Sequence, residues 1–179
     1  MQIAHSSDIE KILQQINVLV IDDNQYMRKV TRNLLVNIGV KNIHEAADGI
    51  AGLETIRALS PDIVLCEWEM PFLNGAELLR IVRSPGVFPV SDVPIIMLSL
   101  HGERWRVLEA LRLGVNEYIK KPVSGKVLLD RMVSILANPR PMVHNGEYYG
   151  PEPRRQFPES PRRESAPATS ALLPDIAAG

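Results

Sequence analysis

Polar side chains in this sequence follow apolar stretches, in a pattern that could support metal or phosphate chemistry. Each stretch is a short run of aliphatic, often β-branched residues, which is typical of a strand buried on both faces of a sheet. In an open α/β sheet, ligands bind at the carboxyl ends of the strands, so residues that follow such runs belong to one edge. These residues are Asp22 and Asp23 after the first run, Glu67 after the third, Ser99 after the fourth, and Lys121 just beyond the fifth.

The residue types at this edge suit a phosphoryl group held together with a divalent cation. Three carboxylates in one crevice repel each other and raise each other's pKa, unless a divalent cation or the lysine offsets their charge. Hard oxygen ligands suit Mg²⁺, which prefers phosphate as a further ligand. The Ser99 hydroxyl and the Lys121 ammonium would complete a cradle for the phosphoryl group. The sequence contains no glycine-rich phosphate loop, which argues against dinucleotide and P-loop nucleotide binding.

The elements that must position these residues are strands and helices that alternate along the chain. Alternation with short connections predicts an α/β fold, with a parallel sheet covered by helices on both faces. Asn74 followed by Glu77 has the pattern of a capping box, and Ser124 can cap the last helix. The predicted strands cover 16–21, 42–46, 62–66, 94–98 and 117–120; the predicted helices cover 25–37, 49–59, 74–83, 103–113 and 124–136, with a short additional helix at 6–14.

The 14 prolines are unevenly distributed and indicate the domain boundaries. Eight of them lie between Pro139 and Pro174, and proline is tolerated poorly in helices and central strands. We therefore expect residues 138–179 to form a Pro/Arg-rich, disordered or extended tail. Residues 16–137 are then the folded domain, and residues 1–15 are an N-terminal extension.

Composition and charge exclude several classes of protein. The net charge of −1 argues against bulk electrostatic binding to nucleic acid or to an anionic membrane. A single cysteine, Cys66, rules out an intrachain disulfide and fits a reducing compartment. No apolar run approaches the ~20 residues of a membrane span, and the N-terminus lacks the features of a secretory signal. We therefore expect a cytoplasmic protein that binds neither nucleic acid nor membrane.

Four segments in combination resemble the response-regulator receiver domain of bacterial two-component signalling, the CheY-like family. They are VLVIDDNQYMRK, VLCEWEMPFLNGAELL, PIIMLS and EYIKKPV, and the resemblance covers about residues 16–137. It implies a flavodoxin-like (βα)5 fold with strand order 2-1-3-4-5. Members of this family accept a phosphoryl group from a histidine kinase on an aspartate, with Mg²⁺, and are signalling modules rather than enzymes. The implied partners are a histidine kinase, a phosphotransfer protein or a downstream effector protein.

The resemblance also implies a role for individual residues. Asp22 and Asp23 match the acidic pair of the metal site, and Glu69 falls where a backbone carbonyl usually ligates the metal. Glu67 stands at the phosphoacceptor position, beside that metal. Ser99 and Lys121 match the hydroxyl and the lysine that contact the phosphoryl group, and Tyr118 matches the aromatic switch residue.

Glu67 is the main departure from the family pattern, which has aspartate at this position. The additional methylene moves the carboxylate outward by up to ~1.5 Å. Phosphoryl transfer depends on positioning, and a displacement of about 1 Å can cost on the order of 100-fold in rate. The longer side chain can also place a negative charge nearer Ser99 and Lys121. The favoured hypothesis is therefore a receiver that works through protein contacts without conventional aspartyl phosphorylation.

Other interpretations remain open at the level of the sequence. The protein could be a phosphorylatable receiver that relays phosphate, or Glu67 could simply fill the site, paired with Lys121. A Mg²⁺-dependent phosphohydrolase is a remote alternative, because the tandem Asp22-Asp23 does not have the Asp-x-Asp spacing of haloacid-dehalogenase-type phosphatases. In a further alternative the tail is the working part and docks as an extended peptide.

Overall fold

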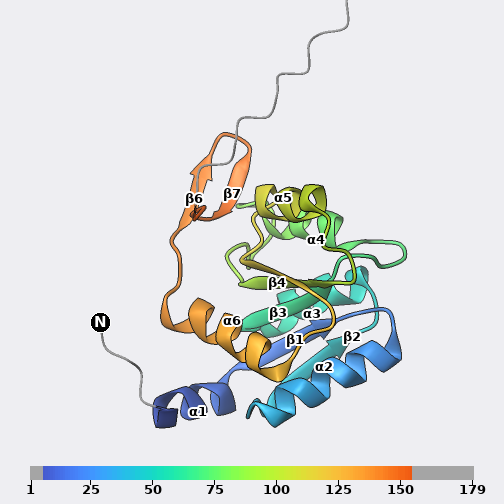
Figure 1. Ribbon diagram of the computed structural model, residues 1–179. Coiled ribbons are helices and arrows are strands. Elements are labelled where there is room, and N and C mark those ends of the chain that lie inside the picture. The colour runs from blue at the N-terminus through green and yellow to red at the C-terminus, as the bar shows by residue number, and fades with distance from the viewer. Residues whose placement is uncertain (1–5, 155–179) are drawn as a thin grey trace, which may run out of the picture.

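A five-stranded parallel sheet forms the centre of the computed structural model, which describes residues 6–154 (Figure 1). Its strands lie in the order β2-β1-β3-β4-β5, so the predicted flavodoxin-like topology is confirmed. Predicted and observed strand boundaries differ by one residue at most, and this places Glu67 and Ser99 as the last residues of their strands. The strands are β1 (Asn17–Ile21), β2 (Asn42–Ala46), β3 (Ile63–Glu67), β4 (Ile95–Ser99) and β5 (Glu117–Lys120).

Four of the described helices follow a residue whose side chain accepts a hydrogen bond from a free backbone N–H group of the first turn. Asn74 accepts from the N–H of Glu77, whose carboxylate accepts from the N–H of Asn74, so the predicted capping box is present. The Ser124 hydroxyl caps the last helix in the same manner. The helices are α1 (Ser6–Gln15), α2 (Gln25–Asn37), α3 (Gly49–Leu59), α4 (Gly75–Val82), α5 (Arg104–Arg112) and α6 (Gly125–Ala137).

The two faces of the sheet support separate hydrophobic clusters. On β1, Leu19 and Ile21 pack into the cluster that α3, α4 and α5 cover, whereas Val18 and Val20 pack into the cluster under α1, α2 and α6. All four side chains are buried, and burial of each contributes roughly 1.5–3 kcal/mol. This two-sided core fixes the direction of the strands, and their carboxyl ends meet at one edge. Within residues 6–154 no helix is long and apolar enough to cross a membrane.

The segment after α6 differs from the expected disordered tail. Residues 142–151 form an antiparallel hairpin of β6 (Met142–Asn145) and β7 (Tyr148–Pro151). The two residues of the turn are Gly146 and Glu147, and Gly146 has a φ of 59°, which is the backbone region that glycine adopts readily. A two-stranded hairpin has only edge strands, where proline is tolerated. The rest of the predicted tail, residues 155–179, lies outside the described residues.

The hairpin docks against the end of α5 through a close contact of two glycines (Figure 1). A Cβ on Gly114 would lie 2.5 Å from the carbonyl oxygen of Tyr149, and a Cβ on Gly150 would lie 2.6 Å from the Cα of Gly114. The buried Arg83 lies beside this contact and donates to the carbonyl oxygens of Gly114 (2.9 Å) and Ser91 (2.6 Å). Burial lowers the pKa of Arg83 to about 10. The hairpin is therefore part of the folded unit.

Replacing Gly114 by alanine is expected to release the hairpin and to destabilise the domain. Gly86 is the matched control, because its φ of 81° is close to the 84° of Gly114 while no atom lies within 4 Å of a Cβ added there. Gly86→Ala should cost about 1–2 kcal/mol of unfolding free energy through backbone strain alone. Gly114→Ala should cost at least about 1 kcal/mol more, because the new methyl group overpacks the contact. Urea unfolding and amide hydrogen exchange of residues 142–151 measure both effects; equal losses in the two variants would contradict the docking.

Candidate functional site

The carboxyl ends of β1, β3 and β5 bring two carboxylates and one ammonium together. Lys121 Nζ lies 2.5 Å from Glu67 Oε2 and 2.8 Å from Asp22 Oδ2. All three side chains are at most 10% exposed. The backbone N–H of Lys121 donates to the carbonyl oxygen of Ser99, which fixes the lysine at the end of the sheet. The three side chains therefore form a compact, buried cluster, which we call the Lys121 cluster.

The other carboxylate oxygens of the Lys121 cluster also accept hydrogen bonds. Glu67 Oε1 accepts from the backbone N–H of Trp68 (2.7 Å) and of Glu69 (3.2 Å). Asp22 Oδ1 accepts from the backbone N–H of Asn24 at 2.9 Å. Because each carboxylate uses both oxygens, the cluster is internally satisfied, as buried charged groups require.

The loop after β3 is held close to Glu67 by a glycine. A Cβ on Gly75 would lie 2.7 Å from the carbonyl oxygen of Glu67, and the Gly75 N–H donates to the carbonyl oxygen of Trp68. This close approach explains why the Met-Pro-x-x-x-Gly segment ends in glycine. It also positions the start of α4 beside the Lys121 cluster.

The charge of Lys121 is stabilised by its two partners. Burial by itself lowers the pKa of Lys121, but the hydrogen bonds and charges of Asp22 and Glu67 outweigh this and leave the pKa raised. The lysine is therefore a fixed cation between two carboxylates. Of the two ways to offset carboxylate repulsion that the sequence left open, the geometry shows the lysine.

Ser99 and Tyr118 lie next to the Lys121 cluster and are linked through the backbone at residue 101. Ser99 Oγ is buried and accepts from the His101 N–H at 3.1 Å. The Tyr118 hydroxyl donates to the His101 carbonyl oxygen at 2.7 Å, and its ring meets Trp68 edge-on at 6.1 Å between centroids. Burial raises the pKa of Tyr118. The predicted hydroxyl and the predicted switch residue thus both form hydrogen bonds to the backbone of His101.

The side chains of Asp23 and Glu69, two further predicted residues, form no ion pair with Lys121. Asp23 is exposed. The Glu69 side chain pairs with Arg106 at 2.5 Å and with His101 at 3.2 Å. Arg106, which is not among the residues predicted for the site, thereby contacts the loop that follows β3.

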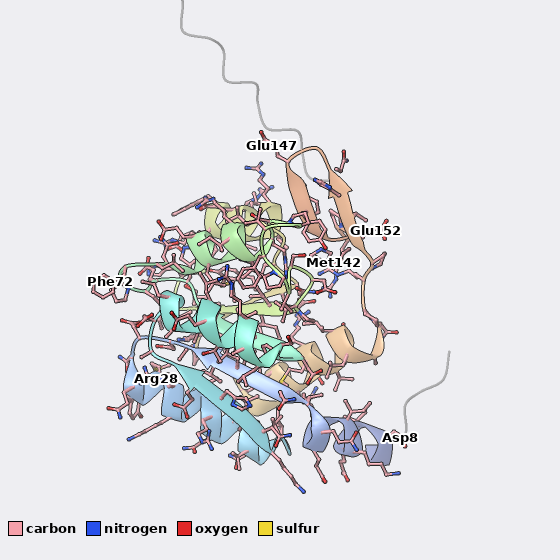
Figure 2. The ribbon with its side chains drawn as sticks, turned by 180° about the vertical axis from the view of Figure 1, so that it is seen from behind. Asp8, Arg28, Phe72, Met142, Glu147 and Glu152 are labelled. Atoms are coloured by element: carbon pink, nitrogen blue, oxygen red, sulfur yellow. The ribbon has the colours of Figure 1, made fainter. Side chains whose placement is uncertain are left out.

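Arg28 is a residue at the site that the sequence analysis missed. It donates to the carbonyl oxygens of Asp22 (2.6 Å) and Asp23 (3.3 Å), and it pairs with Glu45 of β2. Figure 2 labels it on α2, on the side of the molecule where β2 lies. Its position five residues after Asp23, near the start of an expected helix, was the available signal.

Side chains alone do not complete the predicted magnesium site. Among the side chains of the described residues, no group of three His, Cys, Asp or Glu residues is placed to hold a metal ion. The ammonium of Lys121 takes the position between Asp22 and Glu67, and Asp23 faces solvent. Whether the backbone carbonyl of Glu69 could ligate a metal stays a prediction. In this arrangement Lys121 offsets part of the negative charge of Asp22 and Glu67.

Comparison with known proteins relates this fold and site to one family. The family model "Response regulator receiver domain" matches residues 18–133. The chain is 35% identical over 120 residues to the chemotaxis protein CheY1 of Helicobacter pylori, which covers 66% of this chain and 95% of the relative. It is 32% identical over 128 residues to the chemotaxis protein CheY-3 of Vibrio cholerae, which covers 71% of this chain and 97% of the relative.

Solved structures agree with this relationship. The receiver domain of the Francisella response regulator 1452 superposes with a TM-score of 0.61 and 30% identity, covering 68% of this chain and 96% of that one. A response regulator structure from Chloroflexus aurantiacus gives a TM-score of 0.63 at 27% identity, covering 69% and 98%. With its sheet order, its strand-end residues and these matches taken together, the chain belongs to the response-regulator receiver domain family.

Proposed function

We propose that this protein is a receiver that signals through protein–protein contacts without conventional phosphorylation at the acceptor position. Receiver domains are typically non-catalytic modules of two-component signalling that interact with kinases and effectors, and they typically bind Mg²⁺. In this proposal the ion pairs of Lys121 with Asp22 and Glu67 take the place of a phosphoryl group and its metal ion. The partners are a histidine kinase, a phosphotransfer protein or a downstream effector.

The observation that supports this proposal is the short contact between Lys121 Nζ and Glu67 Oε2 at 2.5 Å. A carboxylate acts as a nucleophile through a lone pair that faces the phosphorus atom in line with the leaving group. Here one oxygen of Glu67 holds the lysine and the other holds two backbone N–H groups. Attack would require this buried arrangement to open, so the side chain that stands at the acceptor position is a poor acceptor.

The wild-type protein is expected to gain no mass when it is incubated with acetyl phosphate and magnesium. Intact-mass spectrometry under native pH measures this, with an aspartate-bearing receiver treated in parallel to show that the donor is active. We expect this result because both carboxylate oxygens of Glu67 accept hydrogen bonds. They also lie one methylene group farther from the backbone than those of the aspartate usual at this position, and phosphoryl transfer depends on positioning. A stable adduct of one HPO₃ group that maps to Glu67 would contradict the proposal and would favour a phosphate-relaying receiver.

A further inference from the structure

A pocket of about 370 Å³ lies at the edge of the sheet opposite to the Lys121 cluster. Its lining includes Pro94 and Asn116, which directly precede β4 and β5, so it lies at the amino ends of these parallel strands. The Lys121 cluster lies at the carboxyl ends of the strands. A pocket of this volume is in the range that is typical of sites for small molecules. The pocket is therefore a candidate ligand site separate from the acceptor position.

Most of the pocket wall comes from residues that follow the receiver match. The family model ends at residue 133, whereas seven of the eleven lining residues, from Ser134 to Arg154, lie beyond it. They belong to the end of α6 and to the segment that forms the hairpin and its flanks (Figure 1). The docking of the hairpin on Gly114 holds this segment in place. The pocket is therefore a feature of the C-terminal segment rather than of the matched domain alone.

The buried carboxylate of Glu117 in the pocket lining is shared by two arginines. Arg131 Nη1 lies 3.5 Å from Glu117 Oε2, and Arg154 pairs with Glu117 Oε1. Arg154 lines the pocket, and Arg131 belongs to α6. Because one negative charge already faces two positive charges, Glu117 cannot offset a further arginine.

Two more arginines meet at the neighbouring residue, Asn116, and have only uncharged acceptors among the described residues. Arg83 donates to Asn116 Oδ1 at 3.0 Å, and Arg140 donates to the Asn116 carbonyl oxygen at 2.6 Å. Burial lowers the pKa of both arginines. Asp92, the other carboxylate of the lining, is exposed and forms no ion pair with either arginine. An anion in the pocket would stabilise these partly desolvated positive charges.

Arg140 has donors left with which it can bind such an anion. A guanidinium carries five N–H groups in a planar fork. Arg140 uses one on each terminal nitrogen, for the carbonyl oxygens of Asn116 and Glu152, and has no further acceptor within residues 6–154. The fork matches the oxygens of a carboxylate or a phosphate. The hydroxyl of Ser134 and the side-chain amide of Asn138 line the same pocket and can donate as well.

We infer that the pocket binds a small anionic molecule whose carboxylate or phosphate group pairs with Arg140. Ser134 and Asn138 donate to the remaining oxygens, and Ile135 and Met142 pack against a short apolar part of the ligand. The inference goes beyond the proposed function and does not rest on it. It gives the receiver an input from a small molecule at the edge of the sheet away from the acceptor position.

The test uses the full chain and three probes with the same butyl group: butyl phosphate, pentanoate and uncharged butanol. Amide chemical shifts are followed by nuclear magnetic resonance during titration, because weak binding of small probes is still measured in this way. At least one of the two anions should cause saturable shifts at residues 134–142, whereas butanol should not. A preference for butyl phosphate or for pentanoate identifies phosphate or carboxylate as the group that the pocket recognises.

Two substitutions in the lining should weaken the binding of the anion. Arg140→Gln should do so at least about tenfold, because it removes the charged fork. Arg140 also holds the backbone of its own segment, so Asn138→Asp is the second variant. Asn138 is exposed, and its side chain forms no hydrogen bond among residues 6–154, so the added negative charge should leave the fold intact. This charge should weaken binding at least about fivefold by repelling the anion.

Asn145→Asp is the matched control for Asn138→Asp. Asn145 is exposed on the same segment and does not line the pocket, so binding should stay within about twofold of wild type. The inference is overturned if neither anion causes saturable shifts or if butanol binds as tightly as the anions. Equal effects of Asn138→Asp and Asn145→Asp on binding would overturn it as well.

Discussion

Replacing Lys121 by methionine is expected to lower the free energy of unfolding by about 3–5 kcal/mol at neutral pH. The substitution keeps an apolar side chain of similar length but removes the ammonium between Asp22 and Glu67. Both carboxylates are nearly buried, with 6% and 10% of the side chain exposed, so they would repel each other with little help from water. Urea unfolding followed by far-ultraviolet circular dichroism measures the loss.

A second substitution identifies the origin of this loss. Adding Glu67→Gln to Lys121→Met removes one of the two stranded charges, so the double variant should be more stable than Lys121→Met alone. Lys126→Met is the matched control, because its ion pair with Asp130 is exposed and should contribute less than about 1 kcal/mol. A loss in Lys121→Met no larger than in Lys126→Met would show that the Lys121 cluster does not stabilise the fold.

Replacing Glu67 by aspartate is expected to give a protein that takes up phosphate from acetyl phosphate in the presence of magnesium. The shorter side chain withdraws the carboxylate by up to ~1.5 Å, away from the position in which it contacts Lys121 Nζ. The lysine and Ser99 then remain to contact a phosphoryl group. Because about 1 Å of misplacement costs on the order of 100-fold, the rate should exceed that of wild type by about this factor. Intact-mass spectrometry over time measures it.

Glu69→Asp is the matched control, because it removes the same methylene group from a glutamate that lies two residues after Glu67. Its side chain is exposed and pairs with Arg106 rather than with Lys121, so it should leave the protein unphosphorylated. Equal phosphorylation of wild type and Glu67→Asp would show that glutamate is no barrier. No phosphorylation of Glu67→Asp would show that the extra methylene of Glu67 is not what prevents the reaction.

Local patterns predicted the fold because they reflect interactions close in sequence. The capping box of Asn74 and Glu77 spans three residues, and the alternation of Leu19 and Val20 between the two faces of the sheet follows from strand geometry. The strand-end rule also placed Asp22, Glu67 and Lys121 at one edge. The rule does not predict which group offsets the negative charge of Asp22 and Glu67, because this depends on how far the Lys121 side chain extends from β5 toward β1 and β3.

The hairpin was missed because composition outweighed local turn chemistry. The density of prolines after Pro139 predicted disorder, although Asn145-Gly146 between two short apolar segments is a recognised hairpin signal. The docking could not be predicted at all, because it depends on Gly114 and Gly150 meeting from positions far apart in the chain. Contacts of this kind leave no periodic pattern in either segment.

The docking of the hairpin has a consequence for how the C-terminal segment responds to ionic strength. Its buried contacts are a glycine–glycine approach and hydrogen bonds from Arg83 to uncharged oxygens, and salt screens neither of them strongly. The ion pair of Arg154 with Glu117 involves an exposed arginine, so salt screens it more strongly. Raising the salt concentration should therefore weaken this ion pair while the hairpin stays docked.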